Sequence, residues 1–107
     1  MATLQEVLTG IEHRLAERPE KLAGAAGVYQ LDLTGEDGGS YSLIIAEGKG
    51  DIRPGPAENP GVVVTMAAGD FIAMTGGKLN GMTAFMSGRL KIKGDMGLAL
   101  KLQSLLS

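Results

Sequence analysis

The sequence predicts an α+β fold in one domain that spans residues 1–107. A chain of 107 residues suits a single domain with one hydrophobic core. Helical apolar spacing opens and closes the chain, whereas the middle alternates between apolar and polar residues. Seventeen of the 107 residues are glycine, more than twice the usual share of ~7 %, and they separate these segments. This order favours one mainly antiparallel sheet with helices gathered on one of its faces.

The first predicted element is a helix over residues 2–17. Thr3 and Glu6 have the spacing of a capping box at its start. Pro19 ends the helix or starts a new turn. Apolar residues at three- and four-residue spacing give the helix one buried stripe, formed by Leu4, Val7, Leu8, Ile11 and Leu15.

A meander of three or four strands is predicted next. Tyr29, Leu31 and Leu33 alternate with polar residues, which is typical of a strand with one buried face. Glycine-rich turns and one proline-rich loop separate the strands. The predicted strands lie at 28–34, 40–47, 51–53 and 62–66.

The pattern changes after the fourth strand. Two short helices are expected, one opened by Gly69-Asp70 and one capped by Asn80. A strand at 89–93 and a final helix, capped by Asp95 and running through Leu106, complete the chain. The predicted order is therefore α-β-β-β-β-α-α-β-α.

The final helix is too apolar for contact with one core alone. On a helical wheel its apolar arc covers roughly 220°, about twice the ~100° that a surface helix needs. Such a helix requires a second apolar partner: a larger core, a subunit interface or a ligand. Its apolar residues form two faces, with Leu98, Leu102, Leu105 and Leu106 on one, and Met96 and Leu100 beside Gln103 on the other.

Methionines are concentrated in the same part of the chain. Five of the six lie between Met66 and Met96. Methionine is unbranched and polarisable, so it suits a surface that accepts several ligand shapes. The same property suits gap-filling in a small core, and composition alone leaves both interpretations open.

Motifs for catalysis and cofactors are missing from the sequence. Without cysteine there is no thiol catalysis and no Cys-ligated zinc. The one histidine, His13, falls on the exposed side of the first helix, where nothing positions it as a base. Gly76-Gly77-Lys78 is not followed by the Ser or Thr of a phosphate-binding loop. We therefore expect a protein that is not an enzyme and that has no metal and no cofactor.

Charge and hydropathy limit the partners. A net charge of −2 argues against nucleic acid. Arg89, Lys91 and Lys93 share one face of the last strand, which is either a solvated sheet face or a transient contact with an anionic membrane. No apolar run approaches the ~20 residues of a membrane span, and the N-terminus lacks an apolar signal core. The expected location is cytoplasmic.

Three stretches carry a resemblance to a known family. They are Thr65–Met74, Gly77–Asn80 and Ala84–Gln103, the last including Gly88-Arg89-Leu90-Lys91-Ile92-Lys93-Gly94-Asp95. Together they resemble the sterol carrier protein type 2 family, specifically over 62–106 and more loosely over 1–61.

The resemblance implies a five-stranded sheet covered on one face by helices, with a hydrophobic tunnel between them. It also implies non-catalytic binding and intracellular transfer or presentation of a lipid, which would be a fatty acid, fatty acyl-CoA, phospholipid or sterol. Gln103 would be a polar contact near the head group. Where many relatives continue past Ser107, this sequence stops, so a more open pocket is expected. Mapped by motif, the tunnel would be lined by Phe71, Met74, Leu79, Met82, Phe85, Met86, Met96, Leu100 and Gln103.

A second function class fits the same residues. The surplus apolar face of the last helix could instead form a dimer interface in a structural or interaction module. The sequence leaves monomer and homodimer open, and the partner is then either a lipid or other apolar small molecule, or a second copy of the chain.

Overall fold

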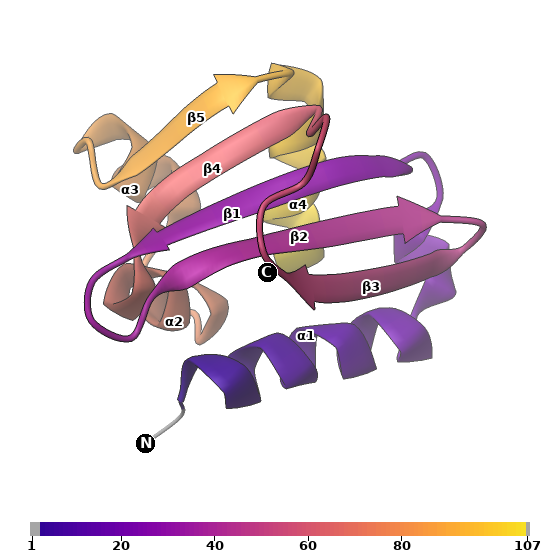
Figure 1. The fold of residues 1–107 in the computed structure, drawn as a ribbon, viewed down its shortest axis with the longest axis horizontal. Helices are drawn as coiled ribbons and strands as arrows, with labels where there is room; N and C mark the ends of the chain where they lie inside the picture. The colour runs from indigo at the N-terminus through magenta and orange to yellow at the C-terminus, as the bar shows by residue number, and fades with distance from the viewer. Residues whose placement is uncertain (1–2, 107) are drawn as a thin grey trace.

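The structure is a computed structural model, and it describes residues 3–106 (Figure 1). The sequence-based element order is confirmed, with one additional turn of 3-10 helix after the first helix. Among residues 3–106, no helix is both long and apolar enough to cross a bilayer. The elements are α1 (Leu4–Glu17), η1 (Pro19–Leu22), β1 (Gly27–Thr34), β2 (Gly39–Ala46), β3 (Lys49–Pro54), β4 (Val62–Ala67), α2 (Ala68–Thr75), α3 (Gly81–Met86), β5 (Leu90–Gly94) and α4 (Met96–Leu106).

The five strands form one mixed sheet in the order β3-β2-β1-β4-β5. Three neighbouring pairs are antiparallel, so the sheet is mainly antiparallel as predicted. The meander prediction is wrong at β4, which runs parallel to β1 with Tyr29 opposite Val62. The chain reaches that position through residues 55–61, which cross the open face of the sheet; there the Ala57 N–H donates to Gln30 Oε1 at 3.1 Å.

Helices α2, α3 and α4 lie on one face of the sheet, and α1 runs along its β3 edge (Figure 1). Tyr29, Leu31 and Leu33 of β1 are buried under these helices, as their alternation predicted. The Tyr29 hydroxyl donates to the Ala25 carbonyl at 2.6 Å. Burial raises the pKa of this phenol, and the negative charge of Asp95 adds to the effect.

Helix α1 covers the exposed edge of β3. Its cap is the predicted one, since Thr3 Oγ1 accepts a hydrogen bond from the Glu6 N–H at 3.2 Å. A Glu12 carboxylate oxygen accepts from the Ile52 N–H of β3 at 3.1 Å. Leu15 packs over Gly50 so closely that a Cβ there would lie 2.9 Å from its Cδ1. The helix thus satisfies a backbone donor of this edge strand that would otherwise face water.

A tight glycine corner places the start of α4. Gly61 accepts a hydrogen bond from the Asp95 N–H at 2.9 Å, and Leu98 covers Gly61 where a Cβ would lie 2.5 Å from Leu98 Cδ1. Gly94 has φ +113°, and a Cβ there would lie 2.6 Å from the Gly61 carbonyl oxygen. Both the backbone angle and the approach therefore require glycine at position 94.

Gly94→Ala is expected to destabilise the fold by about 2 kcal/mol or more, because the added Cβ meets backbone atoms that cannot move aside. The matched control is Gly10→Ala in α1, where a Cβ meets nothing within 4 Å. That change should stabilise the protein by about 0.5–1 kcal/mol, since alanine favours a helix interior. Urea unfolding of both variants measures the difference, and equal stability for Gly94→Ala and wild type would contradict this account of the corner.

Candidate functional site

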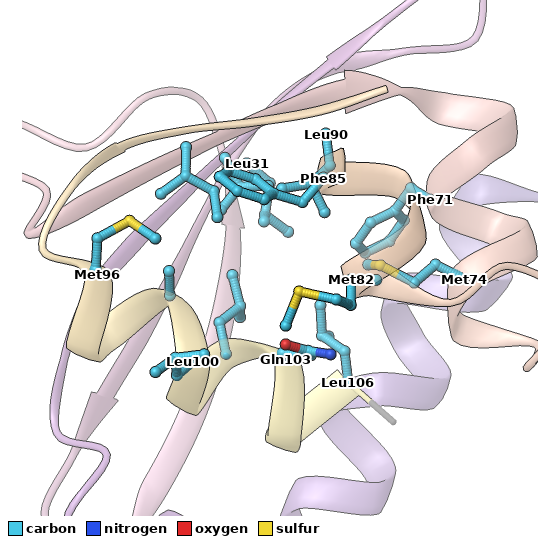
Figure 2. A pocket seen from close by; sticks show the side chains of 15 residues that line it. Leu31, Phe71, Met74, Met82, Phe85, Leu90, Met96, Leu100, Gln103 and Leu106 are labelled. Atoms are coloured by element: carbon cyan, nitrogen blue, oxygen red, sulfur yellow. The ribbon is translucent and has the colours of Figure 1, made fainter. Parts of the chain in front are cut away.

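An apolar hollow lies between the helix-covered face of the sheet and helices α2, α3 and α4 (Figure 2). Its cavity volume is about 150 Å³. No charged side chain lines it among the described residues, and Gln103 is its one polar side chain there. The lining consists of Leu31, Val64, Phe71, Met74, Gly81, Met82, Phe85, Leu90, Ile92, Met96, Ala99, Leu100, Leu102, Gln103 and Leu106.

The sheet supplies the floor of the hollow. Strands β1, β4 and β5 place Leu31, Val64 and Ile92 side by side, because these residues pair in register across the three strands. All three lie on the helix-covered face, where Leu31 and Val64 are buried and Ile92 is half-buried. The floor of the hollow is therefore hydrogen-bonded β-sheet, whose shape should change little when a ligand binds.

The helices supply the walls, and side-chain caps fix where two of them begin. Asn80 Oδ1 accepts from the Met82 and Thr83 N–H groups at 2.8 and 3.2 Å, as predicted, and so starts α3. Asp95 Oδ1 accepts from the Gly97 and Leu98 N–H groups at 2.7 and 3.3 Å at the start of α4. Each cap fixes the rotation of its helix and hence which side chains face the hollow.

Large apolar side chains at the rim are exposed to solvent. Met82 is 53 % exposed, Phe85 40 %, Met96 51 % and Leu100 59 %. Figure 2 shows Met82 and Phe85 extending from α3 and Met96 and Leu100 from α4 around the same space. The hollow is thus an open cleft with an apolar rim, and a closed tunnel is not observed.

Gln103 lies at one end of the hollow, against the start of α3. A Cβ on Gly81 would lie 3.3 Å from Gln103 Nε2, so the missing side chain of Gly81 makes room for the amide. A second depression of about 280 Å³ adjoins Gln103 and extends to Leu79 and Asn80, and its lining is partly polar and partly apolar. The amide therefore lines both the hollow and this second depression.

Seven of the nine sequence-predicted residues line the hollow: Phe71, Met74, Met82, Phe85, Met96, Leu100 and Gln103. Leu79 does not; it is half-buried against the core and lines the second depression. Met86 is 77 % exposed and does not line the hollow either.

Sequence reasoning missed the floor and part of the α4 wall. Leu31 was expected to point inward, but alternation does not distinguish a core position from a cavity wall. Ala99, Leu102 and Leu106 lie on the α4 surface between its core contact and its exposed edge. The helical wheel placed Leu102 and Leu106 on one apolar face of that helix without assigning them to the pocket, and it did not mark Ala99.

The residues considered for catalysis stay apart from the hollow. His13 is exposed on α1, with Nδ1 3.0 Å from Glu17 Oε1 one helical turn later. Among the described residues, no group of three or more His, Cys, Asp or Glu side chains is arranged to hold a metal ion.

Comparison with known families now identifies the fold. The SCP-2 sterol transfer family matches residues 8–107. This chain belongs to the SCP-2 sterol transfer family. The resemblance seen in the sequence is therefore confirmed, and so is the α+β architecture with its five-stranded sheet.

The relatives of this SCP-2 domain include a much longer curated protein and solved structures of similar length. Hydroxysteroid dehydrogenase-like protein 2 of Xenopus tropicalis is 47 % identical over 104 residues, which is 96 % of this chain and 24 % of that protein. The chain thus spans about a quarter of the length of the curated relative. The sterol carrier protein domain 2 of Helicoverpa armigera superposes with a TM-score of 0.79 at 30 % identity, covering 92 % of this chain and 80 % of that one. A palmitated SCP2L2 from Aedes aegypti gives 0.77 at 25 % identity, covering 98 % and 95 %.

Ala99→Leu is expected to fill the SCP-2 hollow, because Ala99 lines it and is 7 % exposed. The variant should lose at least about tenfold in affinity for an apolar fluorescent dye and gain about 1 kcal/mol of stability from the filled space. The control is Ala16→Leu on the exposed side of α1. Dye titration and thermal unfolding measure both effects; a destabilised Ala99→Leu that still bound the dye normally would mean that Ala99 faces a filled core.

Proposed function

We propose that this SCP-2 domain binds the apolar part of a lipid in the hollow and transfers or presents that lipid without catalysis. The observation that carries the proposal is an uncharged, apolar cleft on a rigid sheet, with Gln103 at one end. Such a lining favours hydrocarbon and offers a charged group no partner.

The energy of an unfilled hollow supports this proposal. If it were closed and empty, 150 Å³ would cost about 4 kcal/mol at roughly 24 cal/mol per Å³. That is a large share of the 5–15 kcal/mol that stabilises a typical domain. In the open cleft the cost lies instead in the apolar side chains that face water, and a bound apolar chain covers them, so the protein gains stability whenever a lipid is available.

The size of the hollow indicates that the walls adapt. An engineered apolar cavity of about 150 Å³ in another protein accommodates benzene. A long acyl chain needs more room, and the unbranched side chains of Met82 and Met96 at the rim can move to provide it. The palmitated Aedes aegypti neighbour supports an acyl chain as the ligand class. Solvent extraction of the purified protein distinguishes a fatty acid, a fatty acyl-CoA, a phospholipid and a sterol.

Presentation to an enzyme is part of the proposal. Hydroxysteroid dehydrogenase-like protein 2 is about four times as long as the segment that matches this chain. We infer that this domain holds a lipid for a catalytic partner and supplies no catalytic group itself. The cytoplasmic location expected from the sequence also stays a prediction.

The dimer-interface alternative has one supporting observation, the exposed rim. Met82, Phe85, Met96 and Leu100 are 40–59 % exposed, and a second copy of the chain could cover them. Under this alternative the purified protein is a dimer and binds no lipid.

Native mass spectrometry with solvent extraction tests the proposal. Protein purified under mild conditions is expected to carry a lipid, and delipidated protein to show a higher melting temperature with palmitate. Extraction identifies the bound lipid class. A protein that carries no lipid and shows no thermal shift with palmitate or palmitoyl-CoA would contradict lipid binding.

Leu100→Glu separates the lipid and dimer functions. A carboxylate on the wall should weaken palmitate binding at least about tenfold, because it must be desolvated beside hydrocarbon. The matched control is Ala16→Glu, which adds the same charge to an exposed position of α1. Sedimentation velocity should show an unchanged oligomeric state. Conversion of a dimer to a monomer by Leu100→Glu would favour the interface instead.

A further inference from the structure

Among the residues that the structure describes, the hollow is lined by only one kind of side chain with redox chemistry, the methionine thioether. The other lining residues are hydrocarbon side chains, glycine and the amide of Gln103, none of which reduces a mild oxidant. The sequence has no cysteine and no tryptophan. The lining thioethers belong to Met74, Met82 and Met96. Binding of hydrocarbon does not require their reactivity, because leucine would fill similar space.

Met82 and Met96 place their sulfur atoms at the opening of the hollow. Met82 extends from α3 and Met96 from the start of α4, and Figure 2 shows both sulfur atoms beside the same space. Both residues are about half exposed, at 53 % and 51 %. A ligand inside the hollow and water outside it therefore both have access to these two thioethers.

Three further methionines lie in contrasting environments. Met86 is 77 % exposed at the end of α3 but does not line the hollow, whereas Met66 is 2 % exposed in the core. Met74 lines the hollow and is half-buried. An oxidant that acts from solvent should therefore prefer Met86, whereas an oxidant bound in the hollow should prefer Met82 and Met96.

A thioether reacts with few of the groups that a lipid carries. It is inert to hydroxyl, carboxylate and ester groups, but it accepts an oxygen atom from a hydroperoxide and becomes a sulfoxide. In that step the sulfur lone pair attacks the terminal oxygen of R–O–O–H and the O–O bond breaks. The terminal oxygen loses its proton and the departing R–O oxygen gains one, so the products are the sulfoxide and the alcohol R–OH. The sulfur is oxidised by two electrons, and the hydroperoxide is reduced by the same two.

We propose that the hollow takes up lipid hydroperoxides and reduces them to lipid alcohols at Met82 and Met96, which become sulfoxides. This proposal rests on the proposed function, because the lipid must bind before it reacts. Holding the hydroperoxide beside the sulfur replaces a bimolecular encounter by a reaction within the complex. Water at the open rim carries the proton from the terminal oxygen to the departing one. Each sulfur reacts once until a sulfoxide reductase restores it, so the protein is a consumed reductant and not an enzyme.

Oxidation at the rim also changes the affinity of the hollow. A sulfoxide is polar, whereas the thioether that it replaces is apolar. Sulfoxides at Met82 and Met96 would therefore reduce the apolar surface that covers a bound chain. We expect the product alcohol to leave and a new acyl chain to bind more weakly until the sulfoxides are reduced.

Adaptable packing is the other explanation for methionine at these positions. It depends on the flexibility of the side chain and makes no use of the sulfur chemistry. Under this explanation, oxidation follows exposure to solvent whatever the oxidant is. The two explanations therefore differ in which site a lipid hydroperoxide oxidises first, Met86 or the pair Met82 and Met96.

Peptide mapping by mass spectrometry tests the proposal. Delipidated protein is mixed with linoleic acid hydroperoxide and a metal chelator, which suppresses radical reactions. Met82 and Met96 should be oxidised at least about tenfold faster than Met86. One hydroxy fatty acid should appear for each sulfoxide, and excess palmitate should slow the reaction at both sites.

Hydrogen peroxide is the matched control oxidant, because it does not need the hollow. It should oxidise Met86 at least as fast as Met82 and Met96, since Met86 is the more exposed residue. The same order of sites with both oxidants, or no effect of palmitate on oxidation by the lipid hydroperoxide, would overturn the proposal.

Met82→Leu with Met96→Leu removes the two sulfur atoms while keeping apolar side chains of similar volume. The rate of hydroxy fatty acid formation should fall at least about tenfold, and by more than any change in palmitate affinity measured on the same variant. The control is Met86→Leu, which removes an exposed sulfur atom outside the hollow and should keep the wild-type rate. Equal rates for wild type and the double variant would contradict reduction at the rim.

Palmitate titration of the wild type keeps the two proposals distinguishable. Normal palmitate binding together with no sulfoxide at Met82 or Met96 would contradict the peroxide reduction alone. Binding of neither palmitate nor the hydroperoxide would contradict the proposed function and the reduction that rests on it.

Discussion

The position of α4 over the glycine corner is the constraint on which the rest of the site depends. Leu98 reaches Gly61 because no side chain stands between them, and the Asp95 N–H is bonded to the Gly61 carbonyl oxygen. The Asp95 carboxylate then caps the next two backbone donors. With its first turn fixed in this way, α4 presents Leu102 and Leu105 to the core and leaves Leu100 at the opening.

That placement gives one helix two different apolar environments. Leu105 is 6 % exposed in the core, whereas Leu100, less than two turns earlier, is 59 % exposed at the rim. Close packing stabilises the first group whether or not a ligand is present. The exposed residues at the rim stabilise the fold fully only when a ligand or another apolar group covers them. The stability of the protein and its occupancy by a ligand are therefore linked through the same helix.

Much of this fold was predictable because its signals are local. Thr3, Asn80 and Asp95 marked helix starts, and the structure confirms all three as caps. The parallel pairing of β4 with β1 was not predictable, since alternation tells which face of a strand is buried but does not name its neighbour.

The residues of the candidate site were also predictable only in part. Spacing grouped Met82, Phe85 and Met86 on one stripe of α3, but where the wall ends depends on the neighbouring elements, and Met86 lies beyond it. The floor residues of the strands were hidden because an apolar residue facing a cavity and one facing a filled core look alike in the sequence.

The parallel pairing of β4 with β1 also affects the order of folding. The hairpins β1–β2 and β2–β3 join near neighbours in the chain, whereas Tyr29 must meet Val62, 33 residues further on. Long-range pairing of this kind closes late and slowly. The chain that follows β4 carries α2, α3, β5 and α4, so we expect the half of the molecule that forms the hollow to fold after the first two hairpins. We therefore expect the ligand site to form last, and a lipid to bind only after β4 has paired with β1.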